Sequence, residues 1–117
     1  DGEAYAQSKL ALTIWSRSLA LSIKDNGPSI IAVNPGSLLG SKMVKQAFGI
    51  AGGDIRVGAA ILCRAVLSNE FSAASGQYFD NDKGQFASPH PDVLNLQKAE
   101  EFVNTIETVL KKAITSP

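Results

Sequence analysis

Apolar residues recur at spacings of three and four along the first part of the chain. From about Glu3 to Lys24 two neighbouring stripes can be traced, one with Leu10, Ile14, Arg17 and Leu21, the other with Leu12, Trp15, Leu19 and Ile23. This periodicity predicts a long helix with a broad apolar face. We expect it to end at Gly27-Pro28, because glycine takes a left-handed cap and proline cannot continue a helix.

A second pattern follows from Ser29 to Asn34, where nearly every residue is apolar and many are β-branched. A strand buried on both faces has this composition, as in a parallel sheet covered by helices. Pro35-Gly36 ends this strand. We expect a second strand at Gln77–Asp80, followed by a turn at Asn81–Gly84.

Helical patterns return after the first strand. Asp54 is a good N-cap for a helix from Ile55 to about Ser68, and one face of that helix carries Ile55, Ala59, Leu62 and Val66. A short helix is expected around Val44–Phe48 and a single last helix from about Asp92 to Lys112. Helices that alternate with strands predict an α/β layered fold with parallel strands.

Two parallel strands make a poor sheet by themselves, because two or three helices cannot cover both of their faces. The chain also begins at Asp1 rather than at a methionine. We therefore expect residues 1–117 to be the C-terminal part of a longer domain. Exposed apolar faces usually find a partner, so we also expect a homo-oligomer.

The chain carries 11 basic and 11 acidic side chains. A nucleic-acid-binding protein normally has a basic excess, so no nucleic-acid partner is expected. No apolar run approaches the roughly 20 residues that span a bilayer, so no membrane span is expected. Cys63 is the one cysteine and cannot form an intramolecular disulfide. This favours a reducing compartment, the cytoplasm, and we expect the thiol to be buried.

Tyr5 and Lys9 lie one helical turn apart, so their side chains share a face of the first helix. A nearby ammonium favours the phenolate and lowers the pKa of a tyrosine, which can then exchange a proton with a carbonyl or an alcohol. The bare pair also occurs on ordinary exposed helices, so it needs a second feature to point to catalysis.

The order of motifs is that second feature. Tyr5-Ala6-Gln7-Ser8-Lys9 precedes a strand that ends in Asn34-Pro35-Gly36, and Gly76-Gln77-Tyr78-Phe79-Asp80 comes later. Over roughly residues 3 to 85 the chain resembles the short-chain dehydrogenase/reductase family, and residues 81–112 resemble the tail of its retinol-dehydrogenase-like members. The resemblance implies the C-terminal half of a Rossmann-like doubly wound parallel sheet.

The resemblance also implies an oxidoreductase that uses NAD or NADP to interconvert a carbonyl and an alcohol. Tyr5 would be the general acid/base, and Lys9 would bind the nicotinamide ribose and lower the pKa of Tyr5. The nicotinamide carboxamide would abut Pro35, Gly36 and the backbone of Ser37 and Leu38.

The small-molecule carbonyl or alcohol substrate, apolar or of medium size, is expected to contact the loop 37–53, which contains Leu38, Leu39, Met43, Phe48 and Ile50. The glycines of this loop, Gly49, Gly52 and Gly53, could serve as hinges of a lid. Ser41 could stand for a threonine that touches the cofactor in the family. Ser8 is expected to serve helix packing, His90 an exposed linker, and Asp80 and Asp82 a turn rather than a calcium loop.

The family's glycine-rich phosphate loop and its catalytic serine do not occur in these residues. Backbone N–H groups of that loop cradle the cofactor pyrophosphate. The alternative function is therefore a catalytically inactive chain, stabilised by self-association, with no cofactor binding of its own. No metal site is expected.

Overall fold

The computed structural model describes residues 2–115, apart from the side chains of Asp25, Met43 and Ala47. Met43, an expected substrate contact, thus lies outside the described side chains. The helices are α1 (Gly2–Ile23), α2 (Lys42–Phe48), α3 (Ile55–Leu67), α4 (Pro91–Leu94) and α5 (Leu96–Thr115), with short 3₁₀ turns η1 (Lys24–Asn26) and η2 (Asn69–Phe71). The strands are β1 (Ala32–Asn34), β2 (Tyr78–Asp80) and β3 (Gln85–Ala87).

The three strands form one small mixed sheet in the order β1-β2-β3. β1 and β2 are parallel, with Val33 opposite Phe79, and the crossover between them contains α2 and α3. β3 runs antiparallel to β2, with Phe86 opposite Phe79. The α/β class is confirmed and the two expected strands pair in parallel, but the sheet also has a third, antiparallel strand that the sequence did not predict. The turn at Asn81–Gly84 closes a hairpin and returns the chain along β2.

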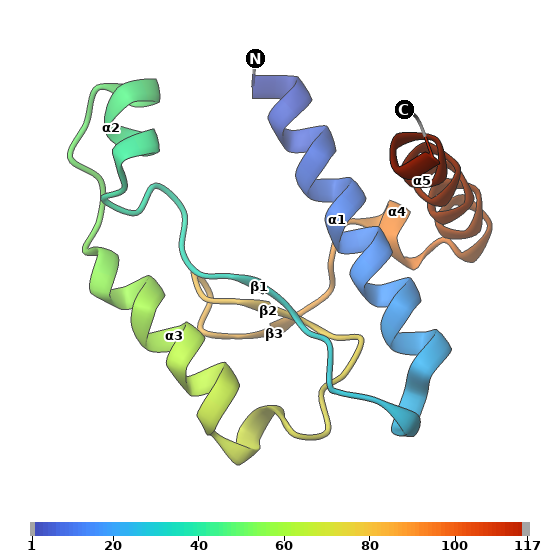
Figure 1. Ribbon diagram of the computed structural model, residues 1–117. Coiled ribbons are helices and arrows are strands. Elements are labelled where there is room, and N and C mark those ends of the chain that lie inside the picture. The colour runs from blue at the N-terminus through green and yellow to red at the C-terminus, as the bar shows by residue number, and fades with distance from the viewer. Residues whose placement is uncertain (1, 116–117) are drawn as a thin grey trace.

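Helices cover both faces of this sheet (Figure 1). α1 lies on one face, with α4 and α5 packed against it, and α3 lies on the other. The core on the α1 side consists of Ile14, Val93 and Ala99, with Leu10 packed against it. The core on the α3 side consists of Ile61, Phe71 and Phe79, with Ile31, Val33, Ala65 and Phe86 packed against it. Alternate residues of β1 and β2 thus point to opposite faces.

Three phenylalanine rings join the β2–β3 hairpin to η2, the 3₁₀ turn that follows α3. The ring centroids of Phe71, Phe79 and Phe86 lie 5.1 to 5.2 Å apart, in tilted and edge-to-face arrangements that aromatic pairs favour. The guanidinium of Arg64 lies 5.4 Å from the Phe79 ring centre and pairs with the Glu70 carboxylate at 2.9 Å. Hydrogen bonds from Arg64, and then from a serine hydroxyl, lower the pKa of Glu70.

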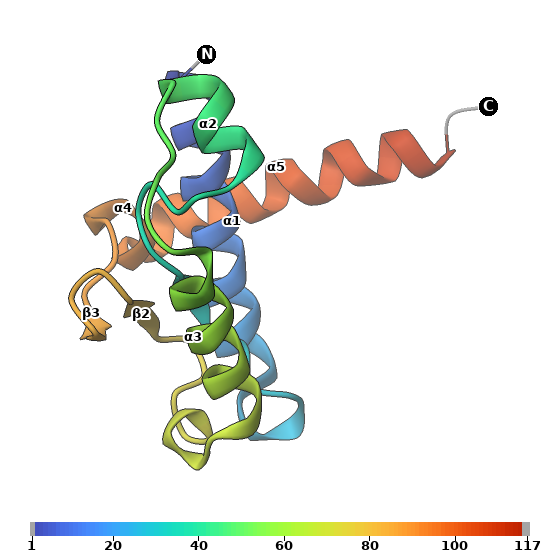
Figure 2. The same ribbon diagram turned by 90° about the vertical axis from the view of Figure 1, so that its left-hand side faces the viewer.

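The single last helix that the sequence predicts is broken at Asn95, which corrects that expectation. Asn95 has an extended backbone, and its Oδ1 accepts a hydrogen bond from the N–H of Lys98 at 3.0 Å. Asparagine in this conformation caps a new helix, so α5 begins as a separate element. α5 packs on α1 with its first half and then projects beyond it (Figure 2). Within residues 2–115, no helix is long and apolar enough to cross a membrane.

The face of α3 that packs on the sheet is not the face with the predicted apolar stripe, which includes Leu62 and Val66. Gly58 and Ile61 are buried, whereas Leu62 and Val66 are 50% and 81% exposed. A Cβ at Gly58 would lie 2.6 Å from Leu39 Cδ1. Because glycine has no side chain, the Gly58 face of α3 can approach the loop that contains Leu39. Cys63, expected to be buried, is exposed on the outer side of this helix.

Candidate active site

Tyr5 and Lys9 lie on the first turns of α1, and both side chains are exposed. Their one-turn spacing places Lys9 Nζ 5.5 Å from the centre of the Tyr5 ring. The ammonium therefore lies over the face of the ring, in the range of a cation–π contact. Ser8 Oγ donates to the Tyr5 carbonyl at 2.7 Å, so this hydroxyl is engaged with the helix backbone.

The segment Pro35–Leu38 leaves β1 in an unusual conformation. Gly36 has a φ of 144° and Leu38 a φ of 51°. A Cβ at Gly36 would lie 3.0 Å from Leu39 Cδ2, so both the backbone angle and the available space favour glycine. A leucine in the left-handed region costs about 1–3 kcal/mol. The surrounding contacts must therefore hold Leu38 in place.

Asn34 joins the end of β1 to the turn after β2. Its Nδ2 donates to Asp80 Oδ1 at 3.1 Å and to Asp82 Oδ2 at 3.0 Å. Its Oδ1 accepts from the N–H of Gly36 at 3.1 Å. Only one orientation of the amide fits, because the opposite one would turn its oxygen toward two carboxylates.

Asp82 holds Ser37 through both donors of that residue. The Ser37 N–H donates to Asp82 Oδ1 at 2.9 Å, and the Ser37 hydroxyl donates to Asp82 Oδ2. These two groups, followed by the amide of Asn34, hold the pKa of the Asp82 carboxyl below its ordinary value of 3.8. In the same turn, Asn81 Nδ2 donates to the Pro35 carbonyl at 2.9 Å. The strand end is thus tied firmly to the turn.

These contacts leave few backbone groups of Pro35–Leu38 unpaired. Proline has no N–H, and the next two N–H groups donate to the side chains of Asn34 and Asp82. Within residues 2–115, the N–H of Leu38 and the carbonyl of Ser37 make no hydrogen bond, whereas the Gly36 carbonyl closes the turn at Ser37 and Leu38. A carboxamide needs one acceptor for its NH₂ and one donor for its oxygen. These backbone groups offer one donor and one acceptor of the kind that a carboxamide needs.

The loop after Leu38 is closed at its base by a parallel bridge between Leu39 and Gly53. The Gly53 N–H donates to the Leu38 carbonyl at 2.8 Å, and the Gly40 N–H donates to the Gly53 carbonyl at 2.7 Å. Gly52 has a φ of 74° and lies directly against this backbone. Gly52 therefore makes a close backbone contact that a side chain would prevent, a use of glycine that the sequence did not predict.

Ser41, the expected counterpart of the family threonine, is the N-cap of α2. Its hydroxyl accepts a hydrogen bond from the Val44 N–H at 3.2 Å. Gly49 ends the same helix in the left-handed conformation, and its N–H donates to the Lys45 carbonyl. The hydroxyl of Ser41 is thus engaged in starting α2.

The Tyr5 end of α1 and the loop that carries α2 lie at the same end of the molecule in both views (Figures 1 and 2). In the described part of the chain, no hydrogen bond or ion pair joins Tyr5 or Lys9 to Pro35–Leu38. The N-terminal end of α1 thus lies near the loop that follows Pro35–Leu38, but the expected site residues do not contact one another directly.

A groove of about 600 Å³ lies between α1 and the end of β2, and its polar lining includes Lys9, Tyr78, Asp80 and His90. This volume is in the range of small-molecule sites. Burial, then the charges of Asp80 and Asp82, raise the pKa of Tyr78. Lys9 is thus the residue shared by this groove and the expected catalytic pair.

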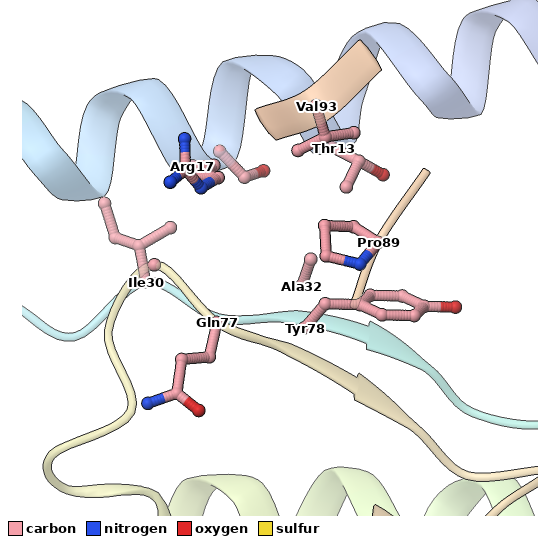
Figure 3. A pocket seen from close by; sticks show the side chains of 10 residues that line it. Thr13, Arg17, Ile30, Ala32, Gln77, Tyr78, Pro89 and Val93 are labelled. Carbon is pink, nitrogen blue, oxygen red and sulfur yellow. The ribbon is translucent and has the colours of Figure 1, made fainter. Parts of the chain in front are cut away.

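Deeper between α1 and the sheet, only a void of about 10 Å³ remains (Figure 3). The Pro89 ring lies over Tyr78 there, and Thr13 and Arg17 approach from α1. A void of this size holds one water at most. α1 is therefore closely packed on the sheet below the groove, which fixes the position of its first turns.

His90 is exposed in the linker before α4, as expected, and it also caps that helix. Its Nδ1 accepts a hydrogen bond from the Asp92 N–H at 3.1 Å, so a proton of the neutral ring lies on Nε2. Over residues 2–115, no three His, Cys, Asp or Glu side chains are grouped so that they could hold a metal ion.

Two residues gain a role that sequence reasoning missed. It placed Asn34 only at a strand end and Asp82 only in a turn. The available signal was topological: the carboxyl ends of adjacent parallel strands meet at one edge of a sheet. Polar residues at or just after the ends of both strands are therefore brought together.

No family model, no curated protein and no solved structure matches the chain. The chemistry of the site therefore rests on its own residues.

Proposed function

We propose that this chain is the C-terminal part of a short-chain dehydrogenase/reductase, which uses NAD or NADP to interconvert a carbonyl and an alcohol. The observation that carries the proposal is the exposed Tyr5–Lys9 pair, on the end of α1 that lies near the loop following Pro35–Leu38. The small sheet would then be one side of a larger doubly wound parallel sheet.

The open edge of β1 supports the larger sheet. Ala32 directs its N–H toward β2, so Ile31 and Val33 direct their N–H and C=O groups to the opposite edge. Beside that edge lies a groove of about 520 Å³, lined by both of these side chains and by Leu62 and Val66 of α3. A further parallel strand would pair with β1 and cover the outer face of α3.

In the reductive direction, the Tyr5 hydroxyl gives its proton to the carbonyl oxygen, and in the oxidative direction Tyr5 takes the proton of the alcohol. A bound nicotinamide supplies or accepts the hydride. The ammonium of Lys9 stabilises negative charge on the phenol oxygen and donates hydrogen bonds to the ribose hydroxyls. The Leu38 N–H and the Ser37 carbonyl would hold the carboxamide.

The test is turnover by the complete product of the gene, measured as NADH or NADPH consumption with a panel of aldehydes and ketones. Tyr5→Phe removes the proton donor and is expected to lower kcat by about 10²- to 10⁴-fold. Thr105→Val, which also removes one exposed hydroxyl, is the control and keeps the activity. A folded Tyr5→Phe variant with full turnover would rule out the assigned role.

A second candidate is a catalytically inactive chain stabilised by self-association. The observation that favours it is the exposed apolar face of α3, where Val66 and Leu67 are each 81% exposed, beside the unpaired edge of β1. A second copy that covered this face would remove apolar surface from water. In that case the isolated chain neither turns over NAD(P)H nor binds it.

Light scattering of the 117-residue chain tests the second candidate. We expect a dimer that Val66→Glu converts to a monomer, because a charge would be buried in the interface. Val109→Glu, at an exposed apolar position on α5, is the control and leaves the dimer intact. A wild-type monomer at all concentrations contradicts self-association.

A further inference from the structure

We propose that Asp82 is a positioning residue for Pro35–Leu38, the candidate cofactor segment. By accepting hydrogen bonds from both donors of Ser37, Asp82 holds the Leu38 N–H in position for a ligand carboxamide. This inference rests on the proposed function, which makes the ligand a nicotinamide. Asp82 acts through the segment and does not itself touch the reacting atoms.

The peptide between Ser37 and Leu38 is the one whose N–H remains unpaired. On one side, Asp82 fixes both the backbone and the side chain of Ser37. On the other side, the Leu38 carbonyl accepts from the Gly53 N–H at 2.8 Å. Hydrogen bonds on both sides thus restrain this peptide and fix the direction of its N–H. They also hold Leu38 at its unfavourable φ of 51°. Such strain persists only where neighbouring contacts determine the conformation.

Asp82 is itself well anchored. Its N–H donates to Asp80 Oδ1 at 3.0 Å, and its Oδ2 also accepts from the Asn34 amide. The other charged groups of this turn are Asp80, which shares the Asn34 amide, and the exposed Lys83. Because the carboxylate accepts from three donors, its charge is well compensated without a salt bridge.

The hydrogen bonds between Asp82 and Ser37 also limit which ligand groups Pro35–Leu38 can bind. Without Asp82, Ser37 would offer an N–H and a hydroxyl next to the Leu38 N–H. With both donors occupied, the segment offers the Leu38 N–H as a donor and the Ser37 carbonyl as an acceptor. This pattern matches the single oxygen and the NH₂ group of a carboxamide.

The experiment has two readouts. The first is hydrogen exchange of the Ser37 and Leu38 amides by NMR, without cofactor. The second is the KM for the cofactor and kcat of the complete gene product. Asp82→Ala is expected to speed exchange of the Ser37 amide at least tenfold and to raise the cofactor KM about tenfold, with a smaller change in kcat. Asp82→Asn keeps an acceptor for the Ser37 N–H, so its exchange rate and its cofactor KM should lie between those of the wild type and of Asp82→Ala. Lys83→Ala, in the same turn, is the control and changes neither readout.

Each result separates the inference from the function it rests on. If Tyr5→Phe abolishes turnover but Asp82→Ala keeps the wild-type cofactor KM, the function stands and the inference is overturned. If exchange of the Ser37 amide is unchanged in Asp82→Ala, the inference is likewise overturned. If the complete gene product never turns over either cofactor, the proposed function fails and the carboxamide ligand fails with it.

Discussion

A side chain at position 52 would collide with the carbonyl oxygen of Leu38, since a Cβ on Gly52 would lie 2.6 Å from that atom. Gly52 also has a φ of 74°. The close backbone packing at the base of the α2 loop therefore requires glycine at position 52. The same contact supports the carbonyl end of Leu38, next to the candidate cofactor segment.

Gly52→Ala should destabilise the chain more than Gly49→Ala. Gly49 has a φ of 65° and no atom within 4 Å of an added Cβ, so alanine there meets only the backbone cost, about 1–2 kcal/mol. At Gly52 the collision should add about 1–3 kcal/mol to the loss. Urea denaturation measures both values. Equal losses in the two variants would mean that the backbone at the loop base does not pack closely.

Phe86→Ala tests whether β3 belongs to the core. This half-buried ring contacts the rings of Phe71 and Phe79, so we expect a loss of about 2–3 kcal/mol in the free energy of unfolding. Gln85→Ala, at the exposed neighbouring position, should stay within about 0.5 kcal/mol of wild type. If the two substitutions have the same small effect, the hairpin does not pack as described.

The hold of Asp82 on Ser37 should weaken in acid. The folded-state pKa of Asp82 lies below its ordinary value of 3.8, so its contribution is present above that value and is lost as the pH falls through the folded-state pKa. Carboxyl resonances of Asp80 and Asp82, followed separately, should show that exchange of the Ser37 amide accelerates with protonation of Asp82. An amide that stays protected until the whole chain unfolds would contradict this coupling.

Lys9→Met should lower kcat/KM of the complete gene product about 10- to 100-fold, because charge-assisted hydrogen bonds to the ribose are lost. Lys9→Arg keeps the charge but not the compact donor geometry, so it should restore activity only in part. Lys42→Met, at an exposed position on α2, is the control. Activity of Lys9→Met equal to that control would exclude a role in cofactor binding.

Local patterns predicted most of the elements. The long periodicity of α1, the Asp54 cap of α3 and the β-branched run of β1 each depend on residues close in sequence. The third strand was missed because Gln85-Phe86-Ala87 is too short to show a pattern, and its stability comes from the rings of Phe71 and Phe79. The orientation of α3 was also missed, because contact between Gly58 and Leu39 depends on tertiary packing.

The candidate site was predictable only in part. Tyr5 and Lys9 are neighbours on one helix, so their spacing was enough to find them. Ser37 and Asp82 are 45 positions apart, and they meet only because parallel pairing brings the ends of β1 and β2 together. No local pattern around Asp82 indicates this partner, and the topological signal shows only that the two strand ends meet, not which residues pair.

The single thiol of the chain has a practical consequence. Cys63 is exposed on α3, the helix whose uncovered outer face includes Leu62 and Val66. A maleimide dye would therefore label Cys63 alone, without any substitution. Its emission would change when another polypeptide binds to that face of α3. The molecule thus has a natural labelling position from which its assembly can be followed by fluorescence.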